Sequence, residues 1–102
     1  MKIDKTVNGD QIIINVEGHL DTNTSPQLES VLNEILDGKR VNLVIDFSKL
    51  EYLSSAGLRV LLIAQKKTNE VVGNLVIKHV NQTVMEVFKL TGFSEFLTID
   101  NN

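Results

Sequence analysis

The apolar residues of this chain recur at two different periods, and the period changes several times along the sequence. A period of two predicts strands and a period of about 3.6 predicts helices, so the alternation indicates an α/β or mixed domain. Ile12, Ile14 and Val16 alternate directly after the turn-forming residues 8–10. Together with the apolar positions in residues 3–7, they predict an amino-terminal β-hairpin.

The first helix is predicted after the chain leaves the sheet at residues 18–21. Thr24 offers a capping hydroxyl, and Pro26 suits the first position of a helix. Gly38 is placed to end this helix. One helical face is apolar, and it comprises Leu28, Val31, Leu32, Ile35 and Leu36.

The middle of the chain predicts the centre of the core. Residues 41–47 are apolar at almost every position, which favours a central strand covered on both faces. A nearly as hydrophobic helix begins near Ser55. Residues 75–77 predict a further strand, parallel to the central one. We therefore expect the central strand and its helix to pack together.

A third helix is expected to begin near Asn81 and to stop at Gly92, and residues 93–99 close the domain as a turn and a last short strand. The whole pattern predicts a mixed β-sheet of four to five strands packed with three to four helices. The chain of 102 residues has the length of one compact domain, so we expect a single domain over residues 1–102.

Composition narrows the possible partners. The net charge is −3 and the basic residues are scattered, so no electrostatic footprint for nucleic acid or an anionic membrane is expected. The chain contains no cysteine, which excludes disulfides within it and fits a reducing cytoplasm. The first residues do not resemble a secretory signal, and no apolar run approaches the roughly 20 residues that cross a bilayer. We expect a cytoplasmic protein that binds another protein and does not insert into a membrane.

The candidate chemistry lies where the central strand runs through a short loop into the second helix. Ser54 and Ser55 stand at the predicted helix start, beside Gly57. A hydroxyl at that position either caps the helix or accepts a phosphate, because unpaired N–H groups and the helix dipole favour an anion there. From helix-start rules alone, the cap is the simpler interpretation.

Other site chemistries find little support in the sequence. His19 and His79 are too few for a metal site and have no cysteine to complete it. Neither is tied to a serine in a nucleophile elbow, and no glycine-rich phosphate loop is present. We therefore expect no catalytic residues, metal or cofactor, and a protein that is not an enzyme.

The chain resembles the STAS domain family along essentially its whole length, most closely the bacterial single-domain anti-sigma factor antagonists. The resemblance rests on residues 18–21 with Thr24, the strand ending at residues 44–48, the turn at residues 53–58, and the late helix ending at residues 90–93. It implies a STAS-like fold without catalytic chemistry.

The resemblance also implies how the protein works. Such a protein binds an anti-sigma factor, which is often a serine kinase, and thereby releases a sigma factor. Phosphorylation of the antagonist reverses the binding, and a serine phosphatase restores it. The family's acceptor position is Ser55 here, while Ser54 replaces the family's usual aspartate and is the alternative acceptor.

Four further residues are predicted to contact the partner. Gly57 leaves the surface open, the Arg59 guanidinium can pair with a phosphate or an acidic partner, and Asp21 and Asp46 are expected at strand ends near the same edge. Each also has a structural alternative: tight packing for Gly57, a solvated charge for Arg59, and loop N–H bonding for both aspartates. A constitutive STAS adaptor subunit of a lipid-transport ATPase complex, without a phosphoswitch, is the alternative function.

Overall fold

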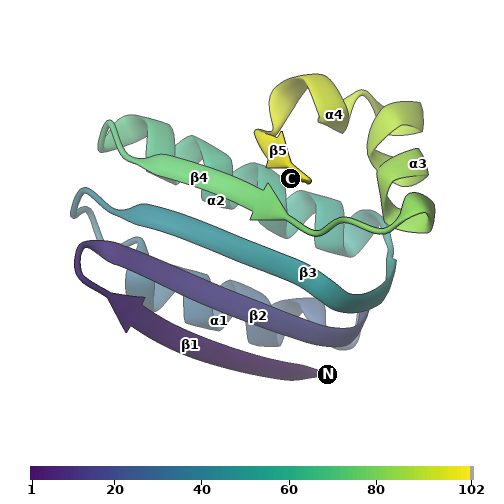
Figure 1. Cartoon of the computed structure of the whole chain (residues 1–102), viewed down its shortest axis with the longest axis horizontal. Helices are drawn as coiled ribbons and strands as arrows, with labels where there is room; N and C mark the ends of the chain where they lie inside the picture. Colours follow the sequence, from purple (N-terminus) through teal and green to yellow (C-terminus); the bar gives the residue numbers. More distant parts are fainter. Residues whose placement is uncertain (102) are drawn as a thin grey trace.

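The computed structural model describes residues 1–101 and contains a five-stranded sheet and four helices (Figure 1). This confirms the predicted class of fold. The strands are β1 (Lys2–Asn8), β2 (Gln11–Leu20), β3 (Asn42–Leu53), β4 (Asn74–Lys78) and β5 (Ile99–Asp100). The helices are α1 (Ser25–Ile35), α2 (Ser55–Glu70), α3 (Gln82–Thr91) and α4 (Phe93–Phe96).

The sheet is mixed, with the strands in the order β1-β2-β3-β4-β5. β1 and β2 form the predicted antiparallel hairpin, in which Asn8 pairs with Gln11 across the turn. The other three neighbouring pairs are parallel. The carboxyl ends of β2, β3 and β4 therefore lie on one edge of the molecule, at the right of Figure 1, where α1, α2 and α3 begin.

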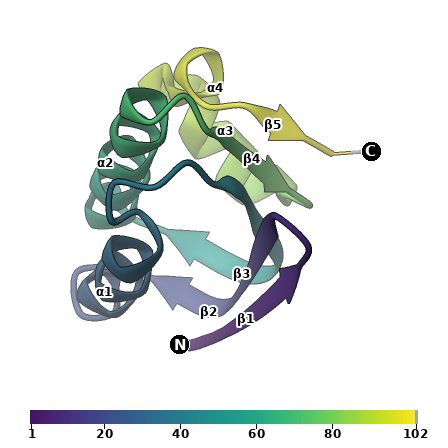
Figure 2. The same cartoon turned by 90° about the vertical axis from the view of Figure 1, so that its left-hand side faces the viewer.

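One face of the sheet is covered by α1 and α2, which lie side by side behind it in Figure 1 and to its left in Figure 2. The expectation that β3 is covered on both faces is wrong. Leu43, Ile45 and Phe47 point into the core and are at most 1% exposed, whereas Asn42 and Asp46 are half-buried on the opposite face. No helix of residues 1–101 lies over that face, so Asn42 and Asp46 reach solvent there, while the Val44 side chain between them is only 7% exposed.

The core fills the space between the sheet and the helices. Its largest fully buried side chains come from all three central strands and from each of the three longer helices. They are Phe47, Phe88, Ile14, Leu20, Leu28, Leu43, Ile45, Leu50, Leu53, Leu61, Ile77 and Val16.

The entry to α1 differs from the prediction in its details. β2 continues to Leu20 rather than leaving the sheet at residue 18. Pro26 does stand in the first turn of the helix, but the Thr24 hydroxyl makes no cap bond. It instead accepts from the Asp21 N–H (2.9 Å) and donates to a backbone carbonyl oxygen of β2 (2.7 Å). The helix ends at residue 35, three residues before Gly38, which adopts a left-handed conformation in the following turn.

α3 begins and ends as predicted. The Asn81 side chain accepts a hydrogen bond from the Val84 N–H (2.8 Å), and its amide donates to the Leu50 carbonyl oxygen of β3 (2.8 Å). Gly92 follows the helix at φ 82°, a left-handed conformation that glycine adopts without the steric cost of a Cβ atom. α3 is thereby tied to β3 beyond the carboxyl end of β4.

Candidate functional site

The end of β2 positions the start of α2. The Ser54 N–H donates to the Leu20 carbonyl oxygen (2.9 Å), and the Leu58 N–H donates to the Ser54 carbonyl oxygen (3.1 Å). Gly57 is buried against the same leucine, because a Cβ atom at position 57 would lie 2.8 Å from Leu20 Cγ. The predicted tight packing of Gly57 is therefore present, and it sets how closely the helix start approaches the sheet.

The two neighbouring serines have different environments. Ser55 is the first residue of α2 and is exposed to solvent. Ser54 occupies the cap position, but its hydroxyl is buried, makes no cap bond, and has no hydrogen-bond partner among the described residues. The interpretation of Ser54 as a bonded helix cap is thus wrong, and an enzyme approaching from solvent reaches the Ser55 hydroxyl first.

This difference predicts that removing the Ser54 hydroxyl does not destabilise the fold. Because a buried hydroxyl without a partner costs free energy, Ser54→Ala should leave the free energy of unfolding unchanged or raise it by up to about 1 kcal/mol. Thr24→Ala, which removes a hydroxyl with two good hydrogen bonds, should lower it by about 1 kcal/mol. Urea unfolding measures both. A loss of stability in Ser54→Ala equal to that in Thr24→Ala would mean that the Ser54 hydroxyl is bonded.

The first turn of α2 favours an anion. The N–H groups of residues 55–57 precede the first intrahelical hydrogen bond, in which Leu58 donates to Ser54. They form the positive end of a 16-residue helix, and its first turn has no acidic residue. A phosphate on Ser55 would therefore be accommodated by the helix itself, without a change of fold.

Asp21 lies beside this turn, directly after the Leu20 that contacts Gly57. Its Oδ1 accepts from the N–H groups of Asn23 (2.9 Å) and Thr24 (3.1 Å). The Thr24 backbone bond is the largest influence on the Asp21 pKa; desolvation opposes it, and the net effect lowers the pKa. Asp21 thus has the predicted structural role. It is half-buried, and it directly follows Leu20, whose carbonyl oxygen accepts from the Ser54 N–H.

Arg59 lies one helical turn after Ser55 and is exposed. It lines a shallow depression between the first turns of α1 and α2 together with Ala56. The α1 side of this depression is lined by Thr22, Ser25, Pro26 and Glu29. Ser54, Ser55, Gly57 and Arg59 all lie at the start of α2, and Asp21 follows the Leu20 that bonds Ser54. These five residues therefore lie at the carboxyl-terminal edge of the sheet.

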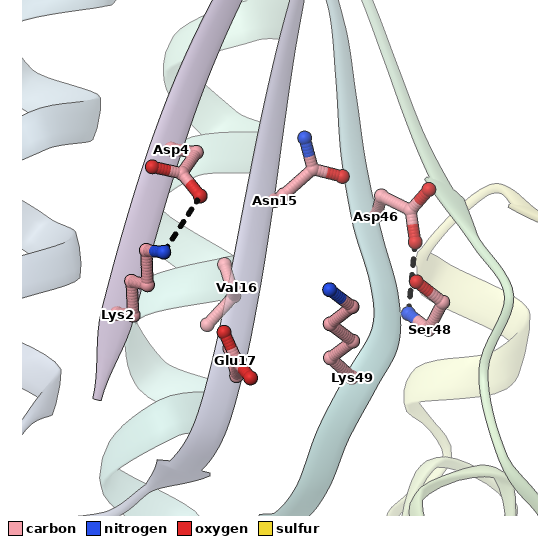
Figure 3. A pocket seen from close by; sticks show the side chains of 8 residues that line it. All are labelled: Lys2, Asp4, Asn15, Val16, Glu17, Asp46, Ser48 and Lys49. Atoms are coloured by element: carbon pink, nitrogen blue, oxygen red, sulfur yellow. Dashed lines mark hydrogen bonds and ion pairs between the residues drawn. The ribbon is translucent and has the colours of Figure 1, made fainter.

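Asp46 is not part of this group. It lies within β3, paired in register with Asn15 and Lys78, on the face without helices. There it helps to line a largely polar pocket (Figure 3). The residues that line this pocket are Lys2, Asp4, Asn15, Val16, Glu17, Asp46, Ser48 and Lys49. The expectation that Asp21 and Asp46 share one edge is wrong because β3 extends to Leu53, well past the apolar segment that predicted it.

The hydrogen bonds of Asp46 make it a stabilising carboxylate. Its Oδ1 accepts from the Ser48 N–H (2.8 Å), and its Oδ2 lies 3.1 Å from His79 Nδ1. Desolvation raises the pKa of Asp46, but the bonds from Ser48 and His79 outweigh it, so the pKa is lowered from its ordinary value of 3.8. His79 itself is held at φ 58° in the segment between β4 and α3.

Acid should therefore weaken the fold through Asp46. Because its pKa is lower in the folded state, its contribution is present above the ordinary value of 3.8 and is lost as the pH falls through the folded pKa. Asp46→Asn should be less stable than the parent at neutral pH and should lose less stability on acidification to about pH 3. Urea unfolding across this range measures it, with Asp4→Asn as the exposed control. Parallel acid profiles for the parent and Asp46→Asn would contradict the assignment.

An aromatic cluster beside the site was missed by sequence reasoning. Tyr52 of β3 is 47% exposed, and its ring lies 6.4 Å from that of His19, its register partner in β2. His19 Nε2 lies 3.4 Å from Glu51 Oε2. Exposed aromatic residues are frequent anchors in protein interfaces. The signal in the sequence was Tyr52 placed two residues before Ser54, in a strand whose predicted range stopped too early.

Residues 1–101 contain neither a metal-binding group of side chains nor a helix that could cross a membrane. These residues contain no group of three or more histidine, aspartate or glutamate side chains arranged to hold a metal ion. Within the same range, no helix has both the length and the apolar character needed to cross a membrane.

The fold and this helix start define a class of protein. The family model described as the STAS domain matches residues 2–102, so the chain belongs to the STAS domain family. It is 34% identical over 91 residues to BtrV of Bordetella bronchiseptica, whose name describes it as an anti-sigma factor antagonist; the match covers 89% of this chain and 78% of BtrV. It is 29% identical over 92 residues to the anti-sigma-B factor antagonist of Listeria monocytogenes, covering 90% and 81%.

Solved structures confirm the fold. An anti-sigma factor antagonist from Mycobacterium paratuberculosis superposes with a TM-score of 0.88 at 23% identity, covering 99% of this chain and 86% of that one. The Bacillus cell fate determinant SpoIIAA, solved in its phosphorylated form, superposes with a TM-score of 0.76 at 17% identity, covering 99% and 93%. At these identities the likeness supports the architecture alone.

Proposed function

We propose that this protein is an anti-sigma factor antagonist: it binds an anti-sigma factor through the surface around the start of α2 and thereby frees the sigma factor that the partner holds. The names of the Bordetella and Listeria relatives support this function. The observation that favours this surface is the exposed Ser55 hydroxyl at the start of a helix held against β2. The protein acts by binding, as one STAS domain over residues 1–102, in the cytoplasm.

Phosphorylation of Ser55 is the proposed switch. A phosphate adds roughly −1.5 to −2 charge to a single side chain at neutral pH. The helix start tolerates that charge, whereas a partner surface shaped for a neutral hydroxyl would have to bury or repel it. The kinase is the anti-sigma factor itself, and a serine phosphatase returns the antagonist to its binding form.

The contact surface combines residues from three elements. Asp21 follows β2, Tyr52 is exposed near the end of β3, and Ser55 and Arg59 lie on the first turns of α2. Gly57 keeps the helix start low against Leu20, so a partner can approach Ser55 closely. Asp46 lies on the sheet face away from α1 and α2, and we assign it to fold stability rather than to the partner contact.

Mass spectrometry of the protein isolated from its native cells tests the switch. Intact-mass and peptide spectra, with and without phosphatase treatment, are expected to place one phosphate on Ser55. Ser55→Ala should abolish it, and the matched Ser54→Ala should retain it because the Ser54 hydroxyl is buried. A phosphate on Ser54 would overturn the assigned acceptor. No phosphate under several growth conditions would favour a constitutive adaptor.

A further inference from the structure

Arg59 is the cation closest in sequence to Ser55 on α2, and the helix places the two residues on one face. Residues four apart on a helix have Cβ atoms about 5–6 Å apart. Helical side chains lean toward the amino terminus, so a residue covers the turn that precedes it. Arg59 lines the depression between the first turns of the two helices together with Ala56, the residue that follows Ser55. Its guanidinium is therefore within reach of a group attached to the Ser55 oxygen.

The guanidinium is also available for such a group. Among the described residues, none of the ion pairs includes Arg59, and Arg59 makes no side-chain hydrogen bond there. Glu29 lines the same depression but is not paired with it. The other two cations of α2 lie near its far end, where Lys67 Nζ donates to Asn33 Oδ1 (2.8 Å).

We propose that Arg59 binds the phosphate of a Ser55-phosphorylated chain within the same molecule. The five N–H donors of a guanidinium match a phosphate in a two-pronged pairing, which is stronger than a neutral hydrogen bond. The phosphate then lies between Arg59 and the free N–H groups at the start of α2. Phosphorylation therefore adds charge to the contact surface and also withdraws Arg59 from any carboxylate of the partner.

This proposal depends on the proposed function only in taking Ser55 as the phosphate acceptor. Its test therefore uses a chain in which phosphoserine is installed at position 55 during synthesis, so that no kinase is required. If native cells contain no phosphate on Ser55, the proposed switch is wrong. The contact between Arg59 and the phosphate is still measured, because the synthetic chain carries phosphoserine without a kinase.

A ³¹P NMR titration of this chain measures the second pKa of the phosphate. A neighbouring cation favours the dianion, so we expect that pKa to be lower, by about 0.3 to 0.5, in the parent than in Arg59→Gln. Lys66→Gln removes the same charge from the same helix three turns away and should titrate like the parent. Arg59→Lys should fall between the parent and Arg59→Gln because it keeps the charge but loses the two-pronged geometry.

Two results of this titration would overturn the proposed contact between Arg59 and the phosphate. Equal phosphate pKa values in the parent and Arg59→Gln would overturn the proposal. If Arg59→Gln and Lys66→Gln raise the phosphate pKa equally, the proposal is also overturned, because the shift then reports the net charge of the chain and not a contact with Arg59. Circular dichroism of each variant checks that the helix is retained, and raising the salt concentration should reduce the difference between the parent and Arg59→Gln.

Discussion

Ser55→Asp is expected to lower the affinity for the cognate anti-sigma factor while leaving the fold intact. In the proposed complex the change places a carboxylate against a partner surface shaped for a neutral hydroxyl, and burying an unpaired charge should cost about 2 kcal/mol of binding free energy, roughly 30-fold in Kd. The fold should not suffer, because an acidic side chain in the first turn interacts favourably with the helix dipole. Calorimetric titration of the purified pair and urea unfolding measure the two effects.

Ser30→Asp provides the matched control. Ser30 is an exposed serine in the middle of α1, so the substitution adds the same charge to the same domain away from the start of α2. Its effect on partner affinity should be less than threefold. Equal losses of affinity in the two variants would mean that net charge weakens the complex, and the assignment of Ser55 to the interface would be wrong.

Gly57→Val should destabilise the protein by about 2 kcal/mol and lower its melting temperature by roughly 10 °C. A Cβ atom at this position lies 2.8 Å from Leu20 Cγ, 2.9 Å from its Cδ2 and 3.2 Å from its carbonyl oxygen. Leu20 is fully buried and cannot swing away without disturbing the core. The helix start must therefore shift from β2, which should also weaken partner binding. Thermal unfolding and the same titration measure these results.

A double-mutant cycle with Leu20→Ala identifies the cause. Removing most of the Leu20 side chain costs about 2 to 5 kcal/mol by itself, because it leaves a cavity. In that background the larger residue at position 57 has space, so Gly57→Val should cost less than it does in the parent. The same cost in both backgrounds would mean that contact with Leu20 is not the reason for glycine at this position.

The sequence predicted helices and strands well where a few neighbouring residues decide the local structure. The hairpin around residues 8–10, the helix start near Asn81 and the stop at Gly92 all depend on short-range turn and helix-end chemistry, which the sequence displays directly. The extent of β3 could not be read in this way. Its second half is largely polar and exposed, and it extends past β4, which pairs only with residues 42–46 of β3. Apolar residues alone therefore do not mark where the strand ends.

The candidate site was predicted in part. Ser55, Gly57, Asp21 and Arg59 do lie together, since parallel strands bring their carboxyl ends to one edge. Ser54 and Ser55 differ because the packing buries the hydroxyl of Ser54 and leaves Ser55 exposed. The sequence does not show which of two adjacent serines at a helix start is buried. Asp46 was misplaced because β3 continues well past it to Leu53, and because its contact with His79 joins residues 33 apart in the sequence, which local patterns do not display.

We propose that the unmodified chain frees a sigma factor and that phosphate on Ser55 prevents this. The most direct measurement adds either form of the purified protein to the complex of the cognate anti-sigma factor with its sigma factor and quantifies free sigma factor. The unmodified chain should release it in proportion to its concentration, and the chain with phosphoserine at position 55 should release little. Equal release by both forms, or release by neither, would contradict the proposed function.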